Sequence, residues 1–538
     1  MADGLLNKAS IILTPTGYKA GTLYNVAPVV EPYEDFDFAR ASVASRVNSS
    51  GLVEMVGRTL SSELVTNGDF ATDSDWNKGS GWSISGGEAI SIGGANFTSL
   101  NQEIGATSGK TYKVIFTISE YTSGQLFLNI QGSSITYTSA DTFTAYVVAG
   151  GSRLYFVSGS GSNQFIGKID NISVKEIIDT NNIPRISYDS NGDNGHILLE
   201  PTSTNLIPYS EDFTTYSIQG RIELISNSTT SPDGLTNSTK IIPTAVSGTH
   251  KLREDLSTVT GTFTQSIFAK QGGYKNILLW DDTTSSGIGV NLDDLSIFRN
   301  QNTLGYNIES FDDGWVRVSV SYSLTSQQLL PSIYIYDNSA TPQIVFTGDG
   351  TSGIYIWGAQ LEALSYATSY IPTLTGSTET RATETATGAG SADLINSTEG
   401  VLYAEIAALV DTDTTYPNRG FSISDGSISN TIFIYFQSAL NIFSCNVLTG
   451  GVTQFYNSTA SYDVTSDIKV ALKYKTNDFA LWINGVEVAT QTSGNAPSGL
   501  NKLSFDNGGG GDDFYGKCKA LAVFNQALSD SELTQLTT

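Results

Sequence analysis

The chain has 538 residues and a formal net charge of −25, and only 15% of its residues are charged. A negative field of this size repels the phosphates of nucleic acids and of anionic membranes, so neither is an expected partner. The two cysteines, Cys445 and Cys518, are too few for a disulfide framework, and we expect both to be free, buried thiols.

No segment of the sequence predicts export or membrane insertion. The opening residues lack the basic-then-apolar pattern of a signal peptide. No apolar run approaches the ~20 residues that a spanning helix needs. Short alternating runs rich in Tyr and Phe are instead broken every eight to twelve residues or so by Gly, Asn, Asp and Ser, and this predicts an all-β chain of sandwiches.

The chain divides into five parts. Residues 1–62 are poor in strand patterns and predict an extended arm with few contacts of its own, which would be ordered against other subunits or a scaffold. Residues 63–178 predict a first β-sandwich and residues 205–374 a second, with 179–204 as a hairpin connector. Residues 375–538 predict a third sandwich with a different spacing of its strands.

The first two sandwiches are predicted to be copies of one type. "ELVTNGDFATDSDW" (63–76) parallels "NLIPYSEDFTTYSI" (205–218), because each reaches Asp-Phe after a turn and then an aromatic residue. Each copy closes on a strand that ends in an acid, "GKIDNISVKEI" (167–177) and "GIYIWGAQLEA" (353–363). Self-similarity of this kind indicates an internal repeat.

The connector contains a near match to a calcium loop. Asp189, Asn191 and Asp193 alternate, and Glu200 falls at the twelfth place. An EF-hand needs glycine at the sixth place, where Asn194 stands, and helices on both sides, which the sequence does not predict. We therefore expect a plain strand–turn–strand hairpin, which would include His196.

The third sandwich contains the clearest local signals. Asn484-Gly485 in "FALWINGVEVATQ" predicts a two-residue hairpin, with Trp482 packed under the turn. At the end of the chain, Ser529 followed three residues later by Glu532 predicts a capped helix.

Three segments resemble recurring parts of bacteriophage virion proteins of the tail-fibre or host-adhesion type. They are "DFDFARASVASRVNSSGLVE" (35–54), "IPRISYD" with "GHILLEPTSTNLIPYSEDF" (183–213), and "YIWGAQLEALSYATSYIPT" (355–373). In that family the first two segments are typically close together, so residues 63–178 look like an insertion at an exposed loop. The resemblance implies a virion protein that attaches to other virion proteins by its N-terminal arm and forms a homo-oligomer, in the first place a homotrimer.

Two sandwiches have resemblances of their own. "NGDF" and "IDNISV" in residues 63–178 resemble carbohydrate-binding modules of the galactose-binding-like jelly roll. "LWINGVEV" and "ALAVFNQALSDSEL" are similar to concanavalin-A-like (laminin-G-like) lectin domains. The jelly-roll resemblance implies a structural calcium held by Asp69 and Asp170 with Glu63, and the alternative is that these acids are solvated turn residues.

Catalytic machinery is not expected. The conspicuous acid pairs, in "WDDTT" (280–284), "FDDGW" (311–315) and "GGDDFY" (510–515), are interpreted as turn acids that bond to their own backbone. His196 and His250 are the only histidines; neither neighbours a nucleophile turn, and two are few for a catalytic zinc site. We therefore predict that the chain is not an enzyme.

Glycan binding is the expected chemistry, because aromatic faces stack on the C–H patches of sugars while amides and acids pair with their hydroxyls. Trp76 and Trp82 lie in the polar, Gly-rich "DSDWNKGSGWSISGG", and Tyr121 lies in "SEYTSG". A loop would expose these three side chains as a sugar platform, whereas the alternative is that the tryptophans close the end of the sandwich. The remaining tryptophans in apolar strands are expected in the core: Trp280, Trp315 and Trp357.

These observations favour a virion fibre or spike that is exposed on the particle surface and binds host-surface glycans non-covalently. Two alternatives remain open at this stage. One is a purely structural decoration of head, collar or tail, and the other is a spike that depolymerises glycans.

Overall fold

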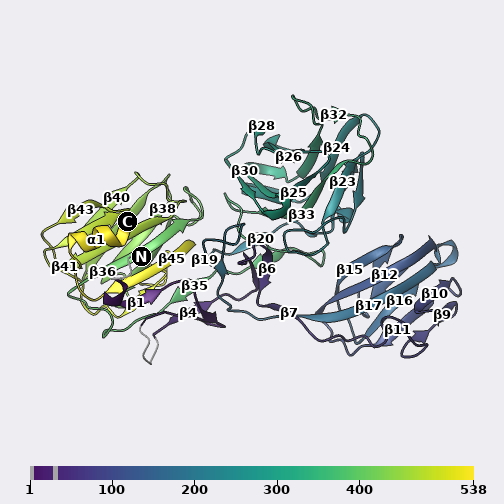
Figure 1. Ribbon diagram of the computed structural model, residues 1–538, viewed down its shortest axis with the longest axis horizontal. Helices are drawn as coiled ribbons and strands as arrows, with labels where there is room; N and C mark the ends of the chain where they lie inside the picture. The colour runs from purple at the N-terminus through teal and green to yellow at the C-terminus, as the bar shows by residue number, and fades with distance from the viewer. Residues whose placement is uncertain (1–4, 28–33) are drawn as a thin grey trace. The chain divides into compact units, whose positions relative to one another are not determined.

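The computed structural model describes residues 5–27 and 34–538, and nearly all regular structure in it is β (Figure 1). The chain folds as two compact units, the smaller formed by Arg58–Asp179 and the larger by the residues before and after it. The backbone N–H of Thr180 donates to the carbonyl of Gly57 at 2.7 Å, so the chain leaves and rejoins the larger unit at one point. This is the connectivity of an inserted domain. No helix in the described residues has the length and apolar character needed to cross a bilayer.

The smaller unit is a sandwich of two antiparallel sheets. One sheet has the order β15(Asp141–Val148), β12(Thr111–Ser123), β17(Ile166–Asp179), β10(Glu88–Ile92), β9(Trp82–Ser85), with β7(Arg58–Leu60) also paired to β17. The other has the order β14(Ile135–Tyr137), β13(Leu126–Asn129), β16(Arg153–Ser158), β11(Ser99–Glu103), β8(Asn77–Lys78). Alternate residues of β12, from Tyr112 to Ile118, are buried between the sheets, as the period of a strand dictates.

The second sandwich, in the larger unit, repeats this topology. Its first sheet has the order β21(Ile218–Gly220), β24(Gly248–Arg253), β31(Pro331–Tyr336), β26(Asn276–Asp281), β27(Ser286–Asn291), β28(Ile297–Gln301), with β32(Val345–Phe346) paired to β24. Its second sheet has the order β22(Ile222–Ile225), β23(Thr239–Pro243), β33(Gly353–Glu362), β25(Thr258–Gly272), β30(Trp315–Gln328), β29(Gly305–Ser310). Each sheet matches one of the smaller unit strand for strand, apart from one extra strand at an edge.

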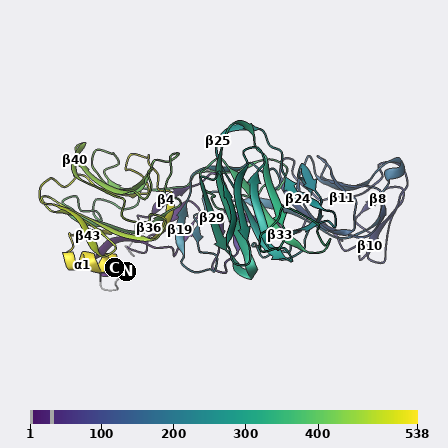
Figure 2. The same cartoon turned by 90° about the horizontal axis from the view of Figure 1, so that it is seen from above.

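The third sandwich is completed by strands from distant parts of the sequence. Its larger sheet has the order β18(Ile186–Ser187), β19(His196–Leu199), β45(Gly516–Phe524), β36(Glu399–Ala408), β41(Ile468–Lys475), β42(Phe479–Ile483), β43(Val486–Gln491), with β1(Ala9–Leu13) on β45. Its smaller sheet has the order β40(Val452–Thr459), β39(Phe443–Thr449), β38(Thr431–Gln437), β37(Asn418–Ser424), β44(Lys502–Ser504). Figure 2 shows the two sheets as separate layers, with α1(Asp530–Thr537) on the outer side of the larger one.

Several local predictions for the third sandwich are confirmed. β42 and β43 pair across Asn484-Gly485, and α1 has the expected capping box between Ser529 and Glu532. Trp482 is buried, and it packs in one cluster with Leu533 and Leu536 of α1. Both cysteines are free and buried, so the fold does not depend on oxidation.

The N-terminal segment does run extended, but the expectation that it makes few contacts within its chain is wrong for the described residues. β1 pairs with β45, and Ile11 and Leu13 are completely buried in the core of the third sandwich (Figure 1). Further along, β2(Tyr18–Lys19), β3(Thr22–Leu23) and β4(Phe36–Ala39) form a sheet with β35(Thr385–Thr387), and β5(Ala44–Val47) pairs with β6(Val53–Val56). An unpaired edge of β45 would expose backbone groups, and β1 covers part of it. Residues 1–4 and 28–33 of the expected arm lie outside the described residues.

The connector forms the predicted hairpin. β18 and β19 are antiparallel, with Ile186 opposite Ile197, and β19 then continues the edge of β45 beyond β1. In the turn, Asp189 accepts the backbone N–H of Asp193 at 2.8 Å, as a turn acid does. Glu200 lies away from this turn in a set of buried ion pairs, so the calcium-loop alternative is excluded.

These ion pairs join residues 35–54 and 183–213 to Arg381 and Glu384. We call the set the ion-pair cluster: Arg40, Arg185, Glu200, Arg381 and Glu384. Every member has a side chain at most 3% exposed. Glu384 contacts both Arg40 and Arg185, and Glu200 pairs with Arg185 at 2.9 Å and Arg381 at 3.0 Å. The short strands β20(Ser203–Asn205) and β34(Glu379–Arg381) pair beside the cluster. Elsewhere in the chain, 3-10 helices occur at Leu6–Lys8, Gly161–Asn163, Phe213–Thr215 and Asp312–Gly314.

Candidate glycan-binding face

The two tryptophans expected to form a sugar platform are buried in the smaller unit. Trp76 and Trp82 are each 6% exposed and belong to its core. The indole N–H of Trp76 donates to the carbonyl of Asn67 at 3.0 Å, and the ring packs on Phe70. The polar, Gly-rich sequence predicts an exposed loop, but each ring turns inward and packs in the core. The expectation that a loop exposes these two side chains is therefore wrong, and sugar binding by them stays a prediction.

Tyr121 is half-buried and is also held by the smaller unit's own residues. Its hydroxyl donates to the carbonyl of Gly124 at 2.9 Å, and its ring lies 6.3 Å from that of Phe165. Phe165 in turn stacks on Trp82 at 6.1 Å. The structure thus brings Tyr121 and Trp82 together around one core phenylalanine, which is a packing arrangement rather than a platform.

The three acids expected to hold calcium are each occupied by nearby donors. Glu63 accepts the backbone N–H groups of Leu64, Val65 and Val174 on one oxygen and the Ser173 hydroxyl on the other. Its carboxylate therefore fastens the start of the smaller unit to β17.

Asp69 and Asp170 accept bonds from residues one or two positions further along the chain, Ala71 and Asn171. No group of three His, Cys, Asp or Glu side chains suited to a metal occurs in the described residues. As placed, Glu63, Asp69 and Asp170 do not fit a shared calcium site. Calcium binding by this unit stays a prediction that titration calorimetry can check.

Half-exposed aromatics lie instead on the outer face of the β14–β8 sheet. In β16, Leu154 and Phe156 are buried, so the intervening Tyr155 points outward, and the same alternation turns Phe127 of β13 outward. Tyr155 is directly opposite Asn129 on one neighbouring strand and Asn101 on the other. Because side chains opposite each other in a sheet lie about 5 Å apart, these residues form one continuous surface. We call it the outer aromatic face.

The polar side chains of the outer aromatic face are held in place by one another. Arg153 donates to the side-chain oxygen of Asn101 at 3.0 Å and pairs with Glu103 at 3.3 Å. Asn77 of β8 donates to the same oxygen of Asn101 at 3.4 Å. A hydrogen bond from Ser152, together with Arg153, holds the pKa of Glu103 below its usual value, so Glu103 stays ionised at neutral pH.

This arrangement offers what a neutral sugar needs. Tyr155 and Phe127 offer aromatic faces, and the Tyr155 hydroxyl forms no hydrogen bond with any residue in the described part of the chain. The amides of Asn77 and Asn129 can both donate to and accept from sugar hydroxyls, whereas Asn101, whose oxygen already accepts two bonds, can only donate. Sequence reasoning missed these residues because "QLFLNI" and "SRLYFVS" are apolar at nearly every position. Such runs do not show which of their two faces is outside.

Neither histidine offers catalytic chemistry at this face. Both lie outside the smaller unit. Both ring nitrogens of His250 contact backbone carbonyls, of Arg221 at 2.7 Å and of Phe346 at 3.0 Å, so the ring fastens a turn. Of the expected turn acids, Asp281 does accept the N–H and hydroxyl of Thr284.

No protein-family model matches the chain, and no curated protein matches it significantly. Among solved structures, the CBM40 of the Ruminococcus gnavus IT-sialidase is 18% identical to this chain. The match covers 28% of this chain and 94% of the CBM40, with a TM-score of 0.24. The CBM22 tandem of Paenibacillus barcinonensis Xyn10C is 10% identical, covering 56% of this chain and 97% of its own at a TM-score of 0.19.

The LG1-3 region of the laminin alpha2 chain is 9% identical, covering 80% of this chain and 96% of its own at a TM-score of 0.14. Scores this low carry no argument about function. The all-β architecture with three sandwiches is established by the sheets themselves.

Proposed function

We propose that the chain binds glycans non-covalently through the outer aromatic face of the smaller unit. The observation that supports this most directly is the row in which Tyr155 lies between Asn101 and Asn129, two amides on the neighbouring strands. An aromatic ring flanked by amides can stack on one face of a sugar and pair with the hydroxyls at its rim. No bond is broken, so the proposed activity needs neither an activated nucleophile nor a tuned acid.

We further propose that the protein is a bacteriophage fibre or spike component that brings this face to host-surface glycans. The support is the resemblance of residues 35–54, 183–213 and 355–373 to virion proteins. The first two segments supply Arg40, Arg185 and Glu200 to the ion-pair cluster, and Ser369 of the third bonds to Arg185 and Glu200. Clustered weak sugar sites gain strength through avidity, which favours a homotrimer. Because β1 and β4 already have partners in their own chain, attachment to the particle must use other surfaces of residues 1–62.

Replacing Tyr155 with alanine is expected to weaken glycan binding about tenfold or more, because a central aromatic anchor typically contributes over 1–2 kcal/mol to binding. The measurement is a glycan-array screen of the wild-type chain, followed by affinity titration with the best ligand. Tyr146 provides the matched control, since it is a half-exposed tyrosine on the opposite sheet of the same unit. Equal losses for Tyr155→Ala and Tyr146→Ala would contradict the assignment of the face.

The two alternatives are separated by simple assays. A purely structural decoration protein would bind nothing on the array. A depolymerising spike would release reducing ends from host polysaccharide.

Immunogold labelling of intact virions with an antibody against the smaller unit tests the proposed place on the particle, and an unlabelled particle would contradict it.

A further inference from the structure

The second sandwich has a face equivalent to the outer aromatic face, with different chemistry. Strands β26, β31 and β24 occupy the places of β13, β16 and β11. Tyr334 of β31 is opposite Lys251 of β24, as Tyr155 is opposite Asn101. The repeat thus keeps an outward tyrosine on the same strand and replaces the amide beside it with a cation.

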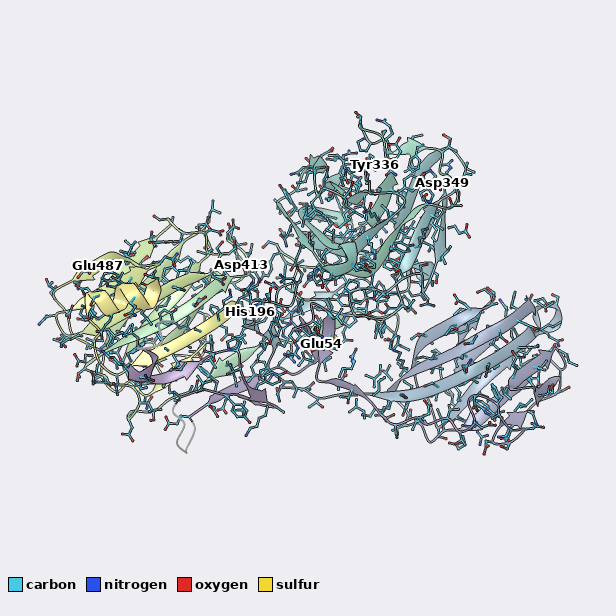
Figure 3. All side chains as sticks on the ribbon, in the orientation of Figure 1. Glu54, His196, Tyr336, Asp349, Asp413 and Glu487 are labelled. Carbon is cyan, nitrogen blue, oxygen red and sulfur yellow. The ribbon has the colours of Figure 1, made fainter. Side chains whose placement is uncertain are left out.

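Aromatic side chains cover the centre of this face. Trp280, Tyr334 and Tyr336 form a cluster on the outer side of the sheet, with Phe298 packed against it (Figure 3 labels Tyr336). Two glycines make room for the rings. A Cβ on Gly287 would lie 2.8 Å from the ring of Trp280, and one on Gly289 would lie 2.5 Å from the ring of Phe298.

Two of the cations on this face share one acid, and Arg253 also pairs with Asp255 at 2.7 Å. Asp282 pairs with Lys251 at 2.9 Å and with Arg253 at 3.2 Å, and it also accepts the Tyr334 hydroxyl at 2.5 Å. Burial raises the pKa of Asp282, but these three donors outweigh burial and hold it below its usual value. Asp282 therefore stays ionised, and its oxygens are occupied.

Arg299 is the cation that has no counter-ion. Its guanidinium lies 4.2 Å from the ring centroid of Trp280, and it donates to two neutral groups, the Tyr336 hydroxyl at 3.1 Å and Gln301 at 3.0 Å. It forms no ion pair with any carboxylate in the part of the chain that the structure describes. Arg299 is half-exposed, so an anion from solution can reach its guanidinium.

We propose that this face is a second binding site, which takes a glycan residue bearing a carboxylate, with the carboxylate on Arg299. The planar guanidinium is already oriented by Trp280 and Tyr336, and its fork geometry matches a carboxylate. Phe298 beside it is half-exposed and offers an apolar edge to the sugar ring. The inference that the ligand is a glycan rests on the proposed function of the equivalent face. The inference that the ligand is an anion rests on Arg299 alone.

The test uses the full chain and a panel of uronic acid and sialic acid oligosaccharides, each beside its carboxyl-reduced counterpart. We expect at least one acidic member to bind at least tenfold more tightly than its reduced form. We expect Arg299→Met to abolish that preference, and Arg299→Lys to retain part of it. Lys275→Met is the matched control, because Lys275 lies in the same sandwich and the change removes the same charge. It should leave the preference intact.

The two proposed sites can be tested independently of each other. Tyr155→Ala should not alter binding of the acidic ligand, and Arg299→Met should not alter binding at the outer aromatic face. Thermal unfolding of each variant shows whether it is folded. Binding by the wild-type chain should also weaken in about 0.5 M salt, which tests the charge contribution without any substitution. The proposal is overturned if no acidic glycan binds, if reduced forms bind equally, or if polyglutamate binds as tightly as the sugars.

Discussion

Replacing Glu384 with glutamine is expected to destabilise the larger unit by about 3–5 kcal/mol, the typical cost of removing one partner from a buried ion pair. Glu384 is fully buried and contacts both Arg40 and Arg185. It also accepts the backbone N–H of Glu200 at 2.9 Å. A neutral amide would leave Arg40 without a carboxylate, while Arg185 and Arg381 would share the single remaining one, that of Glu200.

The measurement is urea unfolding followed by fluorescence, in which the smaller unit serves as an internal reference. Its transition should not move, because Glu384 lies outside it. Glu399→Gln is the matched control, since Glu399 pairs with Lys475 at 2.7 Å where both side chains are partly exposed. Exposed pairs contribute less than about 1 kcal/mol. If the two substitutions shift the larger unit equally, the ion-pair cluster does not have the structural role assigned to it.

The ion-pair cluster shows what sequence reasoning could not reach. The resemblance identified residues 35–54 and 183–213 as a recurring pair of segments, but nothing in their spacing shows why they recur together. Arg40 and Glu384 are 344 positions apart, and charged residues in loops are ordinarily interpreted as solvated. Only the fold brings three arginines and two glutamates into one buried set.

Features with a local cause were predictable. The Asn484-Gly485 hairpin, the capped final helix and the hairpin that includes His196 each depend on residues within about a dozen positions of one another. The sandwich architecture follows from alternating strands and regular turns. The pairing of β1 with β45 depends on a contact between the two ends of the chain, for which a single sequence offers no signal.

The face that we propose from the structure lies in the unit that the sequence indicated, but it consists of other residues. The polar neighbours of Trp76 and Trp82 predict exposure, yet a large apolar ring gains more from burial than a turn loses by folding over it. Tyr155 and Phe127 were passed over because the residues on both sides of them are apolar as well. The side of the sheet on which a residue lies is fixed by register, and register is set by distant partners.

Acidification from pH 6.5 towards pH 4 is expected to destabilise the larger unit through His196, and His196→Gln should remove that dependence. His196, labelled in Figure 3, is 5% exposed, and its Nδ1 donates to the carbonyl of Asn194 at 3.1 Å. Burial, aided by Lys517, lowers the pKa of His196 from 6.5 to about 4. Between these two values the unfolded chain binds a proton that the folded chain does not.

The sign of the effect follows from that difference. Stability is greatest above pH 6.5 and falls as the pH drops, because protonation favours the unfolded state. A shift of this size corresponds to about 3 kcal/mol once the pH is below 4. Glu200, whose pKa is lowered to about 2 mainly by Arg381 and Arg185 against the opposing effect of burial, adds its own loss only below about pH 4.5.

Urea unfolding at pH 7, 6 and 5 therefore isolates the contribution of His196 from that of the ion-pair cluster. The smaller unit has no histidine, so its transition is the reference for any general effect of acid. The wild-type larger unit should lose stability between pH 6.5 and 5, and the His196→Gln variant should lose far less. An equal slope in both proteins would mean that His196 is protonated as readily in the fold as in the unfolded chain, and that burial between β18 and β45 does not exclude its charge.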